Sequence, residues 1–185
     1  MKTVGAITDK QKILMMKEWL QSRSSRDYCL FLLGINTGIR INDLLHLQVK
    51  DAADESGNIL SYLHTSEACF PPIYFNLQVR EALHTCIQEN GLNWEDPLFK
   101  SRKSKNSITR VQAYRIINEA AQAAGIEEPV GTHTLRKTFG YHAYSKGIAV
   151  SLIQKRLQQS SPSETYSYLG ISPKNPPSVT LDINL

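Results

Sequence analysis

The sequence predicts a mainly α-helical domain with a small antiparallel β-sheet, an α+β fold. Three observations lead to this prediction. Helix-capping signals and apolar residues at helical spacing recur along most of the chain. The segment 59–75 is instead rich in Tyr, Ile, Phe and Thr and lacks helical spacing. The length of 185 residues, with 41% apolar residues, suits one domain with a substantial hydrophobic core.

The helical pattern begins with a capping box at residues 8–11. The second helix starts at Ser24 or Ser25, is apolar all round over residues 28–35 and closes near Gly38, which predicts a central core helix. The predicted helices cover about residues 9–21, 24–38, 42–47, 77–89, 109–124, 133–146, 149–158 and 162–170.

The predicted sheet lies between these helices, from Ile59 to Phe75, with a loop around residues 66–70. Near the C-terminus, residues 178–185 alternate between apolar and polar, which predicts a strand that pairs with a sheet edge in the same chain or in a neighbour. We therefore expect a domain over residues 1–171 and a tail over residues 172–185 that could be an exchanged strand.

Positive charge is concentrated in the second half of the chain. Residues 97–163 contain eleven Lys or Arg and three Glu, a net charge of +8, whereas the whole chain carries +4. This asymmetry favours a polyanionic partner for that half, although a basic stretch can also be an ordinary solvated surface. The segment Lys100–Lys105 is polar and basic and predicts a mobile surface loop.

Several function classes are not supported by the sequence. No apolar run in the sequence approaches the length of a membrane span or of a signal-peptide core, so neither a membrane span nor a secretory signal is expected. Cys29, Cys69 and Cys86 lack the close pairs of a zinc or redox site, which favours a reducing, cytoplasmic setting. No P-loop, dinucleotide fingerprint or metal-binding carboxylate cluster occurs in the sequence.

The candidate site residues fall in three segments. On a helix, the spacing of three between His133 and Arg136 brings both side chains onto one face, where they could hold one phosphate. The alternative is a partly buried His beside an Arg whose stem lies along the surface. Arg40 supports the phosphate interpretation, because an Arg in a tight turn beyond a buried helix is costly to orient unless it binds something. The third segment is the helix after Ser161, which carries Tyr166 and Tyr168.

Taken in order, these segments resemble the catalytic domain of the tyrosine recombinases, the phage integrase family of DNA breaking and rejoining enzymes. The family motif Thr-Gly-x-Arg-x-x-Glu-Leu matches residues 37–44, with Asp43 in place of Glu. His-x-x-Arg matches His133 and Arg136. Leu-Gly-His-Ser-Ser, followed by the nucleophilic Tyr nine residues after the His, matches residues 157–161 and Tyr168. The resemblance covers about residues 8–171.

The resemblance implies that Tyr168 attacks a phosphodiester of duplex DNA, giving a 3′-phosphotyrosyl link and a free 5′-hydroxyl. Arg40 and Arg136 would clamp the non-bridging oxygens. His133 would accept the Tyr168 proton or donate to the phosphate, and Gln159 would donate an N–H where the family usually has His or Trp. The resemblance implies no metal or nucleotide cofactor.

The resemblance also implies partners. Duplex DNA is expected to contact the basic half of the chain, including Lys100, Arg102, Lys103, Lys105 and Lys137. Family members act as tetramers on two duplexes and exchange C-terminal segments, which implies a homo-oligomer in which the tail could take part.

Two departures from the family keep an alternative function open. The family has a Lys in its β-hairpin turn that protonates the departing 5′-oxygen, but residues 63–69 contain none; Ser66 falls near that position, and Lys50 and His64 are candidate substitutes. The sequence also begins at the catalytic domain, without the helical domain that closes a clamp around DNA. The alternative is an impaired, integrase-like DNA-binding module; a helical protein-interaction domain is the second alternative.

Overall fold

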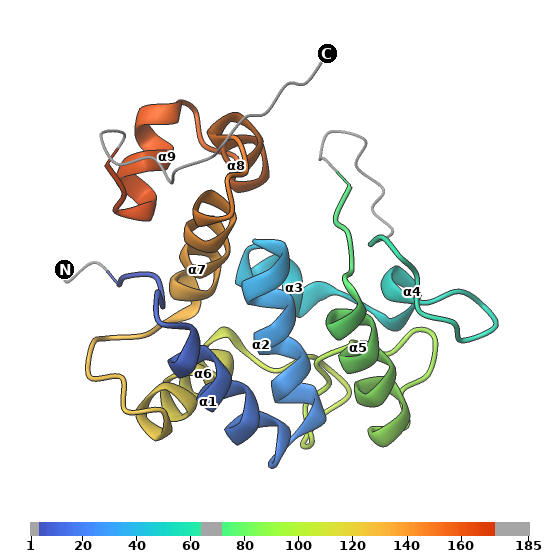
Figure 1. The fold of residues 1–185 in the computed structure, drawn as a ribbon. Coiled ribbons are helices and arrows are strands. Elements are labelled where there is room, and N and C mark those ends of the chain that lie inside the picture. Colours follow the sequence, from blue (N-terminus) through green and yellow to red (C-terminus); the bar gives the residue numbers. More distant parts are fainter. Residues whose placement is uncertain (1–3, 64–71, 173–185) are drawn as a thin grey trace.

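The computed structural model describes residues 4–63 and 72–172 and is mainly helical (Figure 1). Its helices are α1 (Lys10–Gln21), α2 (Ser25–Thr37), α3 (Ile41–His46), α4 (Val49–Ala52), α5 (Leu77–Glu89), α6 (Arg110–Ala123), α7 (Thr132–Ser145), α8 (Val150–Leu157) and α9 (Pro162–Leu169). The predicted helices are confirmed, with ends that differ by about one residue. The short helix α4 was not predicted, because a single turn has no apolar periodicity.

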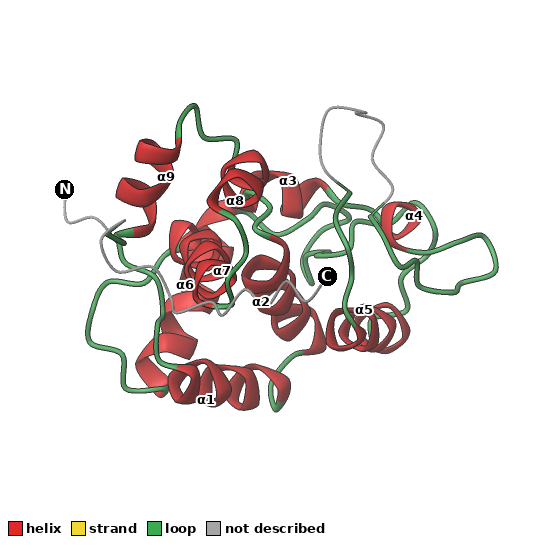
Figure 2. Ribbon diagram, turned by 45° about the horizontal axis from the view of Figure 1, so that its top comes forward, coloured by secondary structure: helices red, strands yellow, loops and turns green. Residues whose placement is uncertain are grey.

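The predicted small antiparallel sheet is not confirmed, because no strand occurs in residues 4–63 or 72–172 (Figure 2). The two sides of the predicted hairpin nevertheless lie side by side. Tyr62 and Tyr74 form an isolated antiparallel bridge, and the Leu63 N–H donates to the Ile73 carbonyl oxygen over 2.9 Å. Pro72 has no N–H with which to extend this pairing. The expected loop at residues 66–70 and the tail strand at 178–185 lie outside the described residues.

Helix α2 is the centre of the fold. Its residues from Cys29 to Gly34 are buried, and it packs against α1, α5 and α7. One core cluster joins α2 to α3, α5 and the segment around Phe99, and a second joins α1, α2 and α6. The apolar residues all round the helix are therefore explained by packing on several sides.

Two glycines allow α7 to approach its neighbours closely. A Cβ atom at Gly34 of α2 would lie 2.5 Å from Leu135 Cδ1, and a Cβ atom at Gly140 of α7 would lie 2.5 Å from Leu169 Cδ2. No carbon atom fits at such distances. These positions therefore bring α7 against α2 on one side and against α9 on the other.

Helices α8 and α9 form a satellite unit at the C-terminal end of α7 (Figure 1). Their buried residues Ile153, Leu157 and Leu169 cluster with Tyr144 of α7, apart from the two larger core clusters. Because α7 also packs on α2, it connects this satellite unit to the main core.

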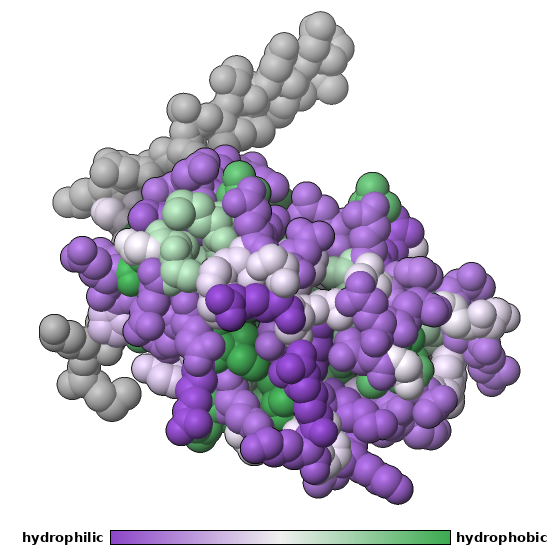
Figure 3. Space-filling view, turned by 90° about the horizontal axis from the view of Figure 1, so that it is seen from below, coloured by the Kyte–Doolittle hydropathy of each residue, from purple (hydrophilic) through white to green (hydrophobic). Residues whose placement is uncertain are grey.

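The face of the molecule seen from below is mostly polar (Figure 3). Figure 3 shows hydrophilic residues over much of the face seen from below, with apolar residues in separate patches among them. Such a distribution is typical of a solvated surface. None of the described helices combines the length and apolar character that crossing a membrane requires.

We predict that Gly38→Ala lowers the free energy of unfolding by about 2 kcal/mol, as measured by urea denaturation. Gly38 ends α2 with φ +67°, and a Cβ atom there would lie 2.5 Å from Phe139 Cδ1. The matched control is Gly57→Ala, since Gly57 has φ +83° and open space around it. The control should lower the free energy of unfolding by about 1 kcal/mol, because it carries the left-handed backbone strain but no steric contact. Equal losses for both variants would show that the contact with Phe139 is unimportant.

Candidate active site

Arg40 is presented by the tight turn between α2 and α3. The Thr37 hydroxyl donates to the Leu33 carbonyl oxygen over 2.6 Å and closes the last turn of α2. Gly38 then redirects the chain, and Arg40, with extended backbone, is the N-cap residue of α3. Because the Arg40 side chain is exposed, the turn places a guanidinium group at the surface directly beyond a buried helix.

Arg136 approaches the same region from α7. Its side chain is buried, and its guanidinium donates a hydrogen bond to the main-chain oxygen of Leu157 at the end of α8. Burial lowers the pKa of Arg136, an effect that the charge of Tyr168 opposes and the charge of Arg40 reinforces. An arginine keeps its proton all the same, so Arg136 is a fixed cation in an unfavourable environment.

His133 is the second residue of α7, one turn before Arg136. Desolvation lowers the pKa of His133 below its ordinary value, and the positive charges of Arg110, Lys137 and Arg136 act in the same direction. The imidazole is therefore neutral near pH 7, the state in which it can accept a proton.

Tyr168 lies on α9, in the satellite unit. Burial raises the pKa of the Tyr168 phenol, whereas the charges of Arg136 and Arg40 lower it. Tyr166, two residues earlier, packs edge-on against Tyr144 with ring centroids 6.0 Å apart. The two tyrosines of α9 therefore have different surroundings, and Tyr168 is the one on the side of the arginines.

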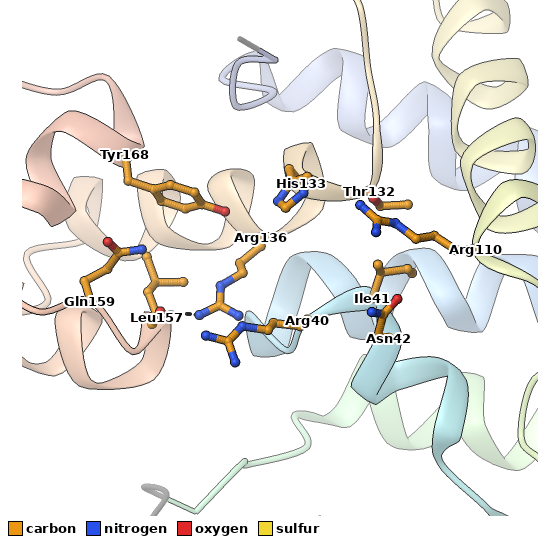
Figure 4. Close-up of a pocket in the computed structure, with 10 residues that line it drawn as sticks. All are labelled: Arg40, Ile41, Asn42, Arg110, Thr132, His133, Arg136, Leu157, Gln159 and Tyr168. Carbon is orange, nitrogen blue, oxygen red and sulfur yellow. Dashed lines mark hydrogen bonds between the residues drawn. The ribbon is translucent and has the colours of Figure 1, made fainter. Parts of the chain in front are cut away.

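These residues line one cavity of about 200 Å³ (Figure 4). Its lining is Arg40, Ile41, Asn42, Arg110, Thr132, His133, Arg136, Leu157, Gln159 and Tyr168. The five residues that the sequence predicts as catalytic are all present. Figure 4 shows the Tyr168 oxygen turned toward Arg136 and His133. The Gln159 Oε1 atom is buried with no hydrogen-bond partner among the described residues.

The cavity is strongly electropositive. In the part of the chain that the structure describes, no carboxylate forms an ion pair with Arg40, Arg110 or Arg136. The first residues of α6 and α7 also line the cavity, and helix N-termini carry partial positive charge. Mutually repelling cations beside helix N-termini form a site for an anion, and guanidinium groups suit phosphate in particular.

Two cationic residues near the site were missed by sequence reasoning. Arg110 is the first residue of α6 and lines the cavity. A cation at a helix N-terminus is unfavourable unless an anion is near, and this signal was available in the sequence after Thr109. Arg156 of α8 donates to the Pro72 carbonyl oxygen over 2.7 Å, and its Nη1 atom is buried without a partner among the described residues. Sequence gave no sign of this contact, which spans more than eighty positions.

Of the two candidate substitutes for the hairpin Lys, only Lys50 is among the described residues. Lys50 forms an ion pair with Glu95 over 2.6 Å and is not among the lining residues. His64 and Ser66 lie outside the described residues. The sequence contains no Lys at all between residues 51 and 99.

The basic segment at residues 100–105 is closed at its base by the Ser101 N–H, which donates to the Asn106 carbonyl oxygen over 2.8 Å. Arg102, Lys103 and Lys105 are exposed. Lys100 is paired with Asp96 over 2.6 Å, so its charge is partly compensated. The Lys137 ammonium lies above the Tyr168 ring. Within residues 4–63 and 72–172, no group of three or more His, Cys, Asp or Glu is arranged to hold a metal ion.

Comparison with known proteins gives consistent results. The model of the phage integrase family matches residues 6–174. The chain is 40% identical over 173 residues to the "probable integrase/recombinase YoeC" of Bacillus subtilis (strain 168), with 92% of each chain covered. It is 35% identical over 150 residues to the type 1 fimbriae regulatory protein FimE of Escherichia coli (strain K12), with 78% of this chain and 74% of FimE covered.

Among solved structures, the fold is similar to that of the XerA recombinase. The TM-score is 0.76 at 20% sequence identity, with 94% of this chain and 61% of the XerA chain covered. The chain therefore spans less than two thirds of that recombinase. A λ integrase (75–356) dimer bound to a COC′ core site gives a TM-score of 0.66 at 18% identity, with all of this chain and 65% of that chain covered.

We predict that Gln158→Gly raises the free energy of unfolding by about 0.5–1 kcal/mol, as measured by urea denaturation. Gln158 has φ +51°, the only left-handed non-glycine residue described, and it stands where the matched motif has Gly. The control is Gln122→Gly, the same change at an exposed position of α6, which should cost about 1 kcal/mol. Destabilisation by both variants would mean that contacts of the Gln158 side chain outweigh the cost of its left-handed backbone.

Proposed function

The chain belongs to the phage integrase family, and from this we propose that it is a site-specific DNA recombinase that breaks and rejoins duplex DNA through a 3′-phosphotyrosyl intermediate. The observation that carries the proposal is the convergence of Arg40, Arg136 and Tyr168 on one cavity. The two arginines are nearly a hundred positions apart in the sequence, and the tyrosine belongs to a separate packing unit. An anion is the ligand that gives such a convergence a chemical purpose.

In the proposed reaction, the Tyr168 oxygen attacks the phosphorus of a DNA phosphodiester. The new oxygen–phosphorus bond replaces the bond to the 5′-oxygen, so the strand ends are a 3′-phosphotyrosine and a 5′-hydroxyl. Arg40 and Arg136 neutralise the charge that builds up on the non-bridging oxygens. Attack by a 5′-hydroxyl on the phosphotyrosine reverses the step and seals the strand.

His133 is the proposed acceptor for the Tyr168 proton. Its lowered pKa keeps the imidazole neutral at the pH at which the phenol must lose its proton. The departing 5′-oxygen takes up a proton in turn, from solvent where no general acid reaches it. Gln159 and Arg110, which also line the cavity, are proposed to donate hydrogen bonds to the phosphate group.

The proposed DNA-binding surface extends from this cavity toward the basic loop. Arg26, in the first turn of α2, donates to the Lys100 carbonyl oxygen over 3.0 Å, whereas Arg40 follows the last turn of the same helix. A helix of 13 residues is about 20 Å long, the length of about six phosphates along one strand. Arg102, Lys103 and Lys105 are therefore proposed to contact backbone away from the cleaved phosphate. Oligomerisation on DNA through residues 172–185 stays a prediction.

An alternative function is a DNA-binding module that does not cleave. The absence of Lys from residues 51–99 favours it, since loss of a general acid typically costs about 10²–10⁴ in rate. The module would keep the same cavity and bind DNA through the same cations. The two functions differ in whether a covalent protein–DNA bond forms.

We predict that the protein forms a covalent adduct with a pool of randomised duplexes that carry a nick, so that religation is blocked. Adduct that survives denaturing electrophoresis should be lost entirely in Tyr168→Phe, because the bond needs the phenol oxygen. Tyr166→Phe, which removes a hydroxyl from the same helix, should retain it. DNA retention at low salt without any adduct would instead support the module.

We predict that replacing Arg102, Lys103 and Lys105 together by Gln reduces the slope of log binding constant against log salt by about 2–3, because each phosphate contact releases counterions. The measurement is fluorescence anisotropy of labelled duplex over a salt series. Lys10→Gln, at an exposed site in the less basic part of the chain, should leave the slope unchanged. An unaltered slope in the triple variant would remove the loop from the DNA-binding surface.

A further inference from the structure

Lys137 makes a contact with the proposed nucleophile that no DNA-binding role requires. Its Nζ atom lies 5.1 Å from the centroid of the Tyr168 ring. This is within the range at which an ammonium group is attracted to the face of an aromatic ring. Lys137 follows Arg136 directly and stands one helical turn after His133. The same stretch of α7 therefore supplies the proposed proton acceptor, His133, and two cations, Arg136 and Lys137.

The contact joins two packing units. Tyr168 belongs to α9, whose buried residues cluster with α8 and the end of α7, apart from the main core. His133 and Arg136 belong to the part of α7 that packs on α2. The position of the Tyr168 oxygen relative to Arg136 therefore depends on how α9 is held against α7. The Lys137 ammonium is a direct link between the nucleophile and that helix.

We propose that Lys137 is a positioning residue for strand cleavage: its ammonium group, resting on the Tyr168 ring, holds the phenol oxygen toward Arg136 and stabilises the phenolate formed during attack. The inference rests on the proposed function, since it assigns Lys137 a part in the same reaction. The phenolate ring is richer in electrons than the phenol ring, so a cation over its face favours the ionised form.

The other charged groups around Tyr168 also influence its pKa and so determine how large the contribution of Lys137 is. The groups that face it or its partners are Arg40, Asp43, Arg110, His133, Arg136 and Arg156, from the α2–α3 turn and helices α3, α6, α7 and α8. Burial raises the pKa of Tyr168, and Arg136 and Arg40 lower it. Because it lies 5.1 Å from the ring centroid, the ammonium of Lys137 is expected to act in the same direction as these two arginines. Burial lowers the pKa of Lys137 itself, which makes its charge more sensitive to alkaline pH.

The first test needs neither DNA nor activity. The ionisation of Tyr168 is isolated by subtracting the ultraviolet titration of Tyr168→Phe from that of the parent protein, both followed at the phenolate absorbance band. In a Lys137→Gln background, the same difference should show the pKa of Tyr168 raised. Lys146→Gln, at an exposed position where α7 ends, should leave it unchanged. An unchanged titration in Lys137→Gln overturns the proposal.

The second test measures the rate of adduct formation on the nicked duplex at saturating protein, where weaker DNA binding no longer matters. Lys137→Gln should slow this step about tenfold and move its rise with pH to higher pH. Lys137→Arg should restore most of the rate, because a guanidinium also stacks on aromatic rings. A wild-type rate in Lys137→Gln would make Lys137 a DNA contact only. If the parent protein forms no adduct, the proposed function fails, and the titration alone decides on Lys137.

Discussion

The structure depends on one electrostatic constraint, the gathering of arginines around a small cavity whose described lining contains no carboxylate. Arg136 is buried beside Arg40, and Arg110 faces the same space. Repulsion among such groups opposes folding, and an anion bound among them would relieve it. The arrangement around the cavity should therefore be more stable with an anion bound than without one. This explains why the site can be recognised before any ligand is placed in it.

The fold holds these cations with backbone geometry rather than with counter-charges. Gly38 turns the chain at the end of α2, where a side chain would meet Phe139, and thereby sets the direction of Arg40. Gly34 lets α7 approach α2, which fixes Arg136 relative to that turn. The main-chain oxygen of Leu157 accepts from Arg136 and ties the guanidinium to the end of α8. A carbonyl oxygen can orient a guanidinium without cancelling its charge, which leaves that charge available to an anion, the proposed phosphate.

Much of this arrangement could be predicted from the sequence. Capping residues and apolar spacing located the helices, because both depend on neighbouring residues. Arg40, His133, Arg136, Gln159 and Tyr168 were recognised from ordered motifs, and all of them line the cavity. The sheet was not recovered as strands, since residue types indicate extended backbone but do not give the length of a ladder. The carbonyl contact of Arg156 and the ring contact of Lys137 could not be predicted, because they depend on packing between elements distant in sequence. Arg110 carried a local signal, a cation at the start of a helix after Thr109, but its place in the cavity depends on how α6 packs beside α7.

The positions of the proton-carrying groups also bear on the rate of the proposed reaction in both directions. In the proposed reaction, Lys137 and His133 stand on the side of the attacking phenol, whereas residues 51–99 contain no Lys to serve the departing 5′-oxygen. In the reverse step that oxygen becomes the nucleophile and must lose its proton, so the same missing group would have acted as the base. Under the proposed mechanism, its absence would slow cleavage and resealing by the same factor and leave the equilibrium between them unchanged. Without the hairpin Lys, the proposed phosphotyrosyl intermediate would therefore live longer, but its fraction at equilibrium would be the same.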